Sequence, residues 1–407
     1  MEIEQLFAER IGGTQFGLSN EIYKFEKIKR AKDAAKKARP DVEILDFGVG
    51  EPDQIAPETI RETLKKEVDD PNNRGYADNG IPEFRIAASR YMENLFGVEN
   101  INPETETNHC IGAKPALAMI PLAFINPGDG CIMTTPGYPV LGTHTQYLGG
   151  KVFNTPLRKE NQFLPDLSAI PTEVADRAKL FYVNYPNNPT GATATETFYD
   201  ELISFAHQYN LLIIQDAAYA TLVYQGSRHS ILNRPGGKDV ALEVHSMSKS
   251  YNMTGWRLGF VVGQALAVKA FSEVKDNIDS GQFKAIQAAA CQGIADTKLA
   301  DSIRGHYEKR LKKLVACLQE VGFEAEMPGG SFFLYVSSPK GAGSLTFNSA
   351  EEASQYLIKE SSVSTVPWNE AGAFLRFSAT FESHHEQDDD RVISELKNRL
   401  LKADLTF

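Results

Sequence analysis

Several features that mark whole classes of protein are missing from this chain. Only 4 of its 407 residues are cysteine, and none of them forms a Cys-x-x-Cys pair. We therefore expect free, buried thiols at Cys110, Cys131, Cys291 and Cys317. No apolar run approaches the ~18 residues of a membrane span. Lysine and arginine, 42 in all, are outnumbered by 53 aspartates and glutamates, which argues against broad nucleic-acid binding and against adhesion to an anionic membrane.

Motifs of several common enzyme classes are missing too. The sequence contains no Walker loop, no Gly-x-Gly-x-x-Gly and no Gly-x-Ser-x-Gly. Its histidines show no His-x-x-x-His spacing, and the pair His384-His385 lies in a charged stretch typical of a surface, so we expect no metal site. The acidic start, Met-Glu-Ile-Glu-Gln, lacks the basic and apolar regions of a signal peptide. With the unpaired cysteines, it predicts a cytoplasmic protein.

The alternation of apolar and helical segments predicts an α/β fold. A chain of 407 residues is too long for one core and predicts roughly two or three domains. Between about residues 108 and 265, short apolar strands alternate with helices, which is typical of a largely parallel sheet. Strands are expected at residues 109–111, 130–134, 150–155, 180–184, 211–215, 241–245 and 260–263. Ligands bind such sheets beyond the carboxyl ends of the strands.

Helices and a second, α+β region are expected on either side of this sheet. Apolar residues at every third position predict an early helix that is capped by Asn20 and ended by Pro40. Long helical stretches are expected at 265–277 and 285–318. Beyond residue 323 we expect strands at 331–336, 363–366 and 374–378, a helix at 349–360, and a last helix capped within 388–390.

The segment that points most directly to chemistry surrounds Lys249. It contains the hydroxyls of Ser246 and Ser248, and Arg257 follows eight positions after the lysine. Hydroxyls and a planar guanidinium suit a phosphate, and a lysine with a lowered pKa can form an imine with an aldehyde. Pyridoxal phosphate (PLP) offers both groups. Alone, the segment is also typical of a solvated serine-rich loop.

Two other strand ends carry polar residues. The strand at 211–215 is followed by Asp216, which, if buried, needs a cationic partner such as a pyridinium N–H. Tyr219, three residues on, can bond a ring hydroxyl. The rigid turn at 185–191 holds Asn188, whose amide can donate to a ligand oxygen. The alternatives are a helix-capping aspartate and a plain strand–helix connection.

Further residues could complete such a site. Ala113 and Lys114 open a helix, whose free N–H groups bind phosphate well, and Lys114 adds positive charge. Tyr138 lies on a stiff Pro-Gly-Tyr-Pro turn, where it can stack on a ring, and Tyr76 can donate to a phosphate. Each is otherwise an ordinary turn or core residue. Arg376 interrupts an apolar strand and, if buried, demands a carboxylate; an internal salt bridge is the alternative to a ligand.

Taken together, these motifs resemble the PLP-dependent aminotransferases of class I/II and fold type I. The match covers nearly the whole chain, in order, at residues 48–53, 75–76 with Gly80 and Arg85, 112–114, 136–139, 186–191, 216–219, 246–249 with Arg257, and 375–378. The resemblance implies a mostly parallel seven-stranded sheet flanked by helices, plus a smaller α+β domain. We expect an arm with part of the small domain at residues 1–50, the large PLP-binding domain at 51–290, and the small domain at 291–407.

The resemblance also implies a role for each residue. Lys249 is the expected Schiff-base lysine and catalytic acid/base, and Asp216 the partner of the pyridine nitrogen. The remaining roles are ring O3′ contact (Asn188, Tyr219), ring stacking (Tyr138), phosphate binding (Ser246, Arg257, Ala113, Lys114, and Tyr76 from the neighbouring subunit) and substrate binding (Arg376, with Gly50, Lys114 and Asn188). A homodimer with shared active sites and ping-pong kinetics between amino acids and 2-oxo acids is implied.

Three segments narrow the resemblance to the LL-diaminopimelate aminotransferases: residues 112–114, 279–287 and 366–369. Those enzymes transfer the amino group of LL-2,6-diaminopimelate to 2-oxoglutarate in lysine biosynthesis. The loop from Tyr76 to Gly80 departs from the pattern of their best-known branch. It is one residue shorter and lacks the glutamate that faces the distal amine, for which Asp78 is the candidate substitute. The Gly-Glu-Pro-Asp turn at 50–53 is that of aspartate, alanine and aromatic aminotransferases, which stay open as alternatives, as does a PLP-dependent C–S lyase.

Overall fold

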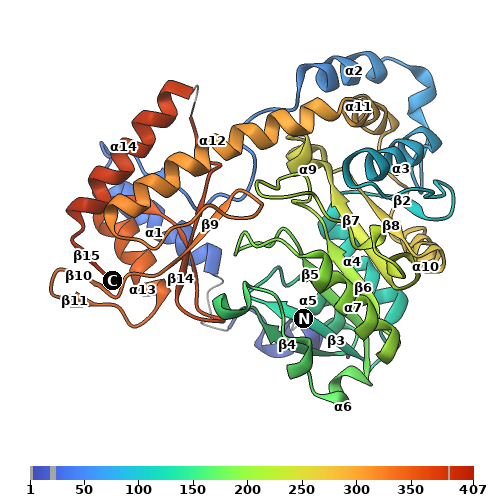
Figure 1. Ribbon diagram of the computed structural model, residues 1–407, viewed down its shortest axis with the longest axis horizontal. Helices are drawn as coiled ribbons and strands as arrows, with labels where there is room; N and C mark the ends of the chain where they lie inside the picture. The colour runs from blue at the N-terminus through green and yellow to red at the C-terminus, as the bar shows by residue number, and fades with distance from the viewer. Residues whose placement is uncertain (1–2, 19–23, 384–385) are drawn as a thin grey trace.

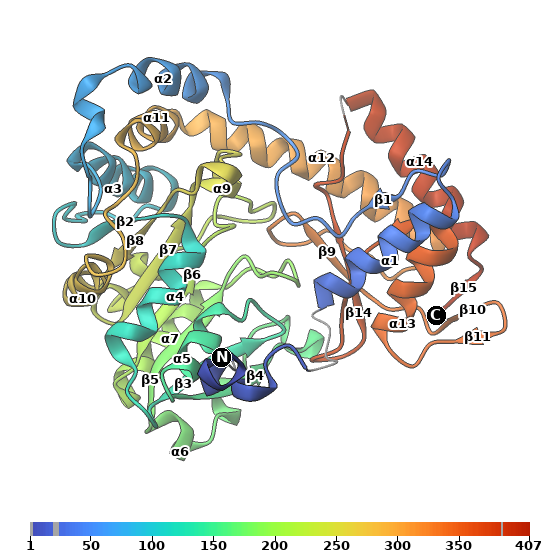
Figure 2. The same cartoon turned by 180° about the vertical axis from the view of Figure 1, so that it is seen from behind.

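The computed structural model describes residues 3–18, 24–383 and 386–407, so the predicted cap Asn20 and the pair His384-His385 lie outside the described residues. Two lobes are visible, joined by the long helix α12 (Thr297–Val321) (Figures 1 and 2). The larger lobe surrounds a sheet, and the smaller one holds the C-terminal strands and helices. Within the described ranges, none of the helices combines the length and the apolar character that a membrane span requires.

The large lobe is built on the predicted seven-stranded sheet. Its strand order is β2-β8-β7-β6-β5-β3-β4, and only β8 runs antiparallel to its neighbours. The strands are β2 (Thr107–Cys110), β3 (Gly130–Thr135), β4 (Lys151–Pro156), β5 (Ala178–Asn184), β6 (Leu212–Asp216), β7 (Ala241–Ser246) and β8 (Gly259–Gly263). Each expected strand is present, with its ends shifted by at most two residues.

Alternating side chains build one core on each face of this sheet. In β5, Phe181 and Val183 belong to one core and Leu180 and Tyr182 to the other, because successive strand residues point in opposite directions. The first core packs under α2 (Glu58–Val68), α3 (Pro82–Phe96), α7 (Glu196–Tyr209) and α11 (Lys284–Ala295), and the second under α4 (Ala113–Phe124), α5 (Val140–Tyr147) and α10 (Ala265–Lys275). Helix α7 lies in front of the sheet in Figure 1 and α4 in Figure 2. Burial on both faces explains the continuous apolar runs of these strands.

The small lobe packs helices on short sheets. Strand β14 (Phe374–Ser378) lies between β9 (Phe333–Ser337) and β13 (Val366–Trp368) in an antiparallel sheet, and β1 (Leu45–Asp46) pairs in parallel with β12 (Val363–Ser364). A third sheet joins β10 (Gly341–Ala342) to β11 (Leu345–Thr346) and β15 (Leu405–Thr406). The helices of this lobe are α1 (Lys24–Ala38), α12, α13 (Ala350–Tyr356) and α14 (Glu386–Lys402); the short α6 (Thr172–Ala175) and α8 (Gly237–Val240) belong to the large lobe.

Three expectations outside the large sheet are wrong in detail. The helical stretch at 285–318 is two helices, because Asp296 leaves helical geometry and caps α12 by accepting a hydrogen bond from the Lys298 amide (3.0 Å). The strand at 363–366 is two strands, since β12 pairs with β1 whereas β13 pairs with β14. The last helix begins before its predicted cap, and Asp389 binds the buried Arg310 instead (2.8 Å).

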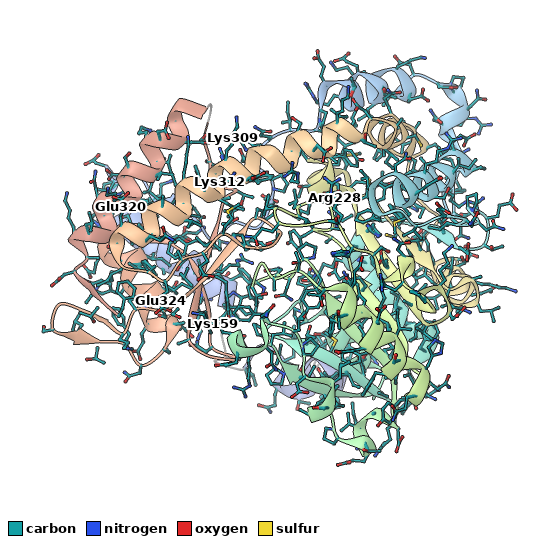
Figure 3. All side chains as sticks on the ribbon, viewed as in Figure 1. Lys159, Arg228, Lys309, Lys312, Glu320 and Glu324 are labelled. Atoms are coloured by element: carbon teal, nitrogen blue, oxygen red, sulfur yellow. The ribbon has the colours of Figure 1, made fainter. Side chains whose placement is uncertain are left out.

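Ion pairs also connect distant segments across the lobes. The Nζ of Lys159, after β4, lies 3.2 Å from a carboxylate oxygen of Glu324, which follows α12 (Figure 3). Arg228 of the large lobe pairs with Asp301 at the start of α12. Pairs with exposed partners contribute about 0–1 kcal/mol each, so the continuous α12 does more to fix the two lobes relative to each other. The domain limits expected at residues 51 and 291 stay a prediction.

Candidate active site

A cavity of about 480 Å³ lies between the lobes, at the carboxyl ends of β5, β6 and β7. This volume is within the range of small-molecule sites. Every predicted site residue except Tyr76 lines it: Gly50, Ala113, Lys114, Tyr138, Asn188, Asp216, Tyr219, Ser246, Lys249, Arg257 and Arg376. Tyr76 lies away from the cavity and is 82% exposed, and its expected role in a neighbouring subunit stays a prediction.

Asp216 ends β6 and is buried at the floor of this cavity. The sheet register places it beside Asn184 of β5 and Val244 of β7. Its carboxylate accepts hydrogen bonds from the Tyr182 hydroxyl and the Ala218 amide, both 3.1 Å long. Both donors are neutral, and no ion pair with this carboxylate occurs among the described residues. Burial raises the pKa of Asp216 to about 6, because the charged form loses its water. A carboxylate in this state is suited to a ligand that brings a positive group.

Lys249 lies on the short helix α9 (Met247–Ser250), whose first turn is capped by the Ser246 hydroxyl. Its Nζ donates a hydrogen bond to the carbonyl oxygen of Gly50 (2.9 Å), so the side chain reaches from the large lobe to the small one. Burial lowers the pKa of Lys249 to about 8. The negative charge of Glu51 acts to raise this pKa, whereas the positive charges of Arg257 and Arg376 lower it further. The lowered pKa makes the neutral, nucleophilic amine easier to form here than at an exposed lysine.

Arg257 faces the beginning of α4. Arg257 follows a 3₁₀ turn, and its own φ is 56°. Its Nη1 donates to the Thr254 carbonyl (2.8 Å) and to the Ser248 hydroxyl (3.3 Å). Its Nη2 lies so close to Gly112 that a Cβ on that residue would be 2.3 Å away. Gly112 has a φ of 85°, and Ala113 then begins a helix of 12 residues. A guanidinium beside free helix N–H groups makes an anion site, and the absent Cβ leaves it open.

Arg376 lies in β14, the central strand of its sheet, and is 3% exposed. Its Nη1 donates to Asn188 Oδ1 (2.8 Å), its Nη2 donates to the Gly48 carbonyl (2.9 Å), and the Phe333 ring lies 3.9 Å from its Cζ. Its buried Nε has no hydrogen-bond partner. Among the described residues no carboxylate pairs with it, so the internal salt bridge is not found there. Burial lowers the pKa of Arg376 to about 10. An unpaired buried guanidinium is a receptor for a ligand carboxylate.

Sequence reasoning missed the residues that hold the site residues in place. Besides the contact from Tyr182, Asn184 donates to the Asp216 carbonyl (2.8 Å) and accepts from the Asn188 amide (2.8 Å). Both residues lie near the carboxyl end of β5, and their place at that end of a central strand was the available signal. The contribution of α1 to the cavity wall was missed as well.

Two further sequence predictions concern the cysteines and metal binding. All four cysteines are free, as predicted; Cys110, Cys131 and Cys317 are buried, whereas Cys291 is only partly so. In the part of the chain that the structure describes, no group of three or more His, Cys, Asp or Glu side chains could hold a metal ion.

Known proteins share both the sequence and the fold. The family described as aminotransferase class I and II matches residues 42–396. The LL-diaminopimelate aminotransferases of Methanocaldococcus jannaschii and Methanococcus maripaludis are 53% and 50% identical to this chain, each over 100% of it and 99% of the relative. The substrate-bound BacF structure from Bacillus subtilis has a TM-score of 0.86 at 28% identity, covering 98% of both chains. The chain belongs to the aminotransferase class I and II family.

Proposed function

We propose that the protein is a PLP-dependent aminotransferase that transfers the amino group of LL-2,6-diaminopimelate to 2-oxoglutarate by a ping-pong mechanism. The observation that carries the reaction is the cavity that Lys249, Asp216 and Arg376 line together. These residues supply an amine, an uncompensated carboxylate and an uncompensated guanidinium. The choice of amino donor rests on the relative from Methanocaldococcus jannaschii, which is named LL-diaminopimelate aminotransferase and is 53% identical to this chain over its full length.

The residues of the cavity fit PLP. Asp216 is buried among neutral donors and suits a protonated ring nitrogen. The site formed by Arg257, Gly112 and the first amides of α4 suits the phosphate. The assignments of Tyr138 to the ring face, of Asn188 and Tyr219 to the ring hydroxyl, and of Ser246 to the phosphate are supported by their places on the same cavity wall.

The proposed mechanism assigns each step to a side chain. When bound, PLP supplies an aldehyde and a ring that takes up the electron pair left on the substrate's Cα. Lys249 would hold the cofactor by its aldehyde carbon in the resting enzyme. Once the substrate's amino group has taken its place, the freed amine, whose neutral form is favoured by the lowered pKa of this buried lysine, would take the Cα proton and pass it to that same carbon. Asp216 would keep the ring nitrogen protonated. Arg376, fixed by Asn188, holds the α-carboxylate so that the Cα–H bond faces Lys249.

The proposal includes a homodimer in the cytoplasm. Tyr76, exposed and away from its own cavity, is assigned to the phosphate of the neighbouring subunit. Four apolar side chains, Leu6, Leu18, Ile55 and Leu266, are between 69% and 73% exposed, which supports burial against a partner. The unpaired cysteines support the cytoplasmic location.

The test is a screen of half-reactions by single-turnover absorbance. The holoenzyme is mixed with LL-diaminopimelate, aspartate, alanine, glutamate or tyrosine, and the loss of the bound-cofactor band is timed. We expect LL-diaminopimelate to react fastest of the donors other than glutamate, and Lys249→Ala to abolish the change. If aspartate or alanine reacts far faster, the donor is wrong although the reaction class stands. Release of ammonia or a thiol, without amination of 2-oxoglutarate, would instead indicate a lyase.

A further inference from the structure

One wall of the cavity carries charges that the reaction at Cα does not use. Helix α1 contributes Phe25, Ile28, Lys29 and Lys32 to the lining, and this spacing of three and four residues is that of one helix face. The Nζ of Lys32 lies 2.6 Å from Oδ2 of Asp46, which also lines the cavity. The two side chains are 31% and 26% exposed, so both charges are within reach of a ligand.

This ion pair is linked to the arginine that would hold the substrate's α-carboxylate. Asp46 Oδ1 accepts a hydrogen bond from the Gly48 amide (2.9 Å), and the Gly48 carbonyl accepts one from Arg376 (2.9 Å). Lys32 is therefore connected to Arg376 through the side chain of Asp46 and the backbone of Gly48. A ligand with charged groups at both ends of a short carbon chain is suited to this arrangement.

Both partners of the ion pair keep hydrogen-bonding capacity. An ammonium group has three donors and each carboxylate oxygen accepts two bonds, whereas Lys32 gives one bond to Asp46 and each Asp46 oxygen accepts one. The pair can therefore take up an ammonium and a carboxylate at the same time. Lys29 adds a second positive charge to the same wall, which favours a ligand that brings a carboxylate.

We propose that Lys32 and Asp46 determine donor specificity by binding the distal amino-acid centre of the substrate, Lys32 its carboxylate and Asp46 its ammonium. The inference rests on the proposed function, whose donor carries a second amino-acid centre. Lys32 also serves the distal carboxylate of the 2-oxo acid acceptor. Because that acceptor and glutamate have no distal ammonium, Asp46 is the residue that separates the bis-amino acid from them. Asp78, the substitute expected from the sequence, does not line the cavity of its own chain.

The experiment compares holoenzyme variants by the ratio of kcat/KM for LL-diaminopimelate to kcat/KM for glutamate. Asp46→Asn keeps an acceptor for the Gly48 amide but removes the negative charge and the oxygen that accepts from Lys32. We expect the ratio to fall about tenfold or more, through KM rather than kcat. Lys32→Gln should lower kcat/KM for both donors, and Lys32→Arg should restore most of it. The matched control is Lys27→Gln: Lys27 lies on the same helix and pairs with Glu351 at 2.8 Å, away from the cavity, so the ratio should not change.

A second readout does not depend on turnover. Pimelate, a seven-carbon dicarboxylate without an amino group, cannot react, and its binding to the holoenzyme is measured by calorimetry. Lys32→Gln should weaken this binding at least about tenfold, whereas Asp46→Asn should not weaken it, because no ammonium is present. Weaker pimelate binding in Asp46→Asn would contradict the assignment of the two charges.

Other results would overturn the inference. If wild-type enzyme uses LL-diaminopimelate but Asp46→Asn leaves the ratio unchanged and Lys32→Gln leaves kcat/KM unchanged for both donors, the distal centre binds elsewhere. A fall in the ratio in Lys114→Gln or Asp78→Asn alone would likewise place the distal centre at another wall of the site. If wild-type enzyme rejects LL-diaminopimelate, the proposed donor itself is wrong, and this is seen before any variant is made.

Discussion

Asp216→Asn removes a negative charge from a buried position while keeping the shape of the side chain. Asp216 is 5% exposed, and burial raises its pKa from an ordinary 3.8 to about 6. A difference of about two pKa units corresponds to about 3 kcal/mol of folding free energy once the group is ionised in both states. The cofactor-free protein bears this destabilisation at any pH well above 6, and a bound pyridinium would relieve it.

The pH dependence fixes the sign of the effect. Because the folded pKa lies above the unfolded one, the contribution of this carboxyl group is most favourable below about pH 4 and is lost as the pH rises through about 6. Asp216→Asn should therefore raise the unfolding free energy of the cofactor-free protein by up to about 3 kcal/mol at pH 8 and by about half as much at pH 5. The single oxygen of the amide can accept from the Ala218 amide, and its NH2 group then donates to the Tyr182 hydroxyl. These weaker hydrogen bonds reduce the gain by about 1 kcal/mol.

Urea unfolding of the cofactor-free proteins at pH 5 and pH 8, at one protein concentration, measures this difference. Asp200→Asn is the control: the exposed Asp200 pairs with Arg234, which lowers its pKa, so its loss should destabilise the protein slightly instead. Titration with PLP should then reverse the order, with wild-type protein binding more tightly. If Asp216→Asn destabilises the cofactor-free protein at pH 8, or stabilises it equally at both pH values, the buried charge is already compensated and the reasoning is wrong.

Three further predictions concern the other walls of the site. Gly112→Ala should raise the PLP dissociation constant at least about tenfold. The new Cβ would lie 2.3 Å from Arg257, and the positive φ adds strain of about 1–2 kcal/mol. The control is Gly128→Ala, which has a φ of 90° but open space around the new Cβ; it should lower the unfolding free energy by the strain alone and leave PLP binding intact. Arg376→Lys should lower kcat/KM about ten- to a hundredfold, because one charge-assisted hydrogen bond to the α-carboxylate is lost. An unchanged kcat/KM would mean that Arg376 does not bind the substrate. The rate at which cofactor-free protein combines with PLP should rise with pH through about 8, where Lys249 loses its proton; stopped-flow absorbance measures it, and a midpoint above pH 10 would mean that the lysine is not desolvated.

The large lobe was predictable because local patterns determine it. Continuous apolar strands alternating with helices leave few arrangements other than a parallel sheet, and such a sheet brings the carboxyl ends of its strands to one edge. Asp216, Asn188 and Lys249 follow three of these strands in the sequence, so they were expected to meet, and all three line the cavity. The same argument about strand ends applies to the residues that support them. Tyr182 and Asn184 lie at the carboxyl end of β5, but no sequence motif marks them.

The small-lobe wall was not predictable, because it is assembled from segments far apart in the sequence. The spacing of Phe25 and Ile28 predicts the apolar face of a helix, but not that Lys29 and Lys32 beside it turn toward a cavity. Asp46 gains its position only through the pairing of β1 with β12, more than 300 residues later in the chain. The large lobe thus carries most of the groups that suit the chemistry shared by the family, whereas Lys32 and Asp46, the residues proposed to choose among donors, lie in the small lobe. Resemblance therefore identifies the reaction more securely than the substrate, and substitutions at Lys32 and Asp46 address the part that motifs leave open.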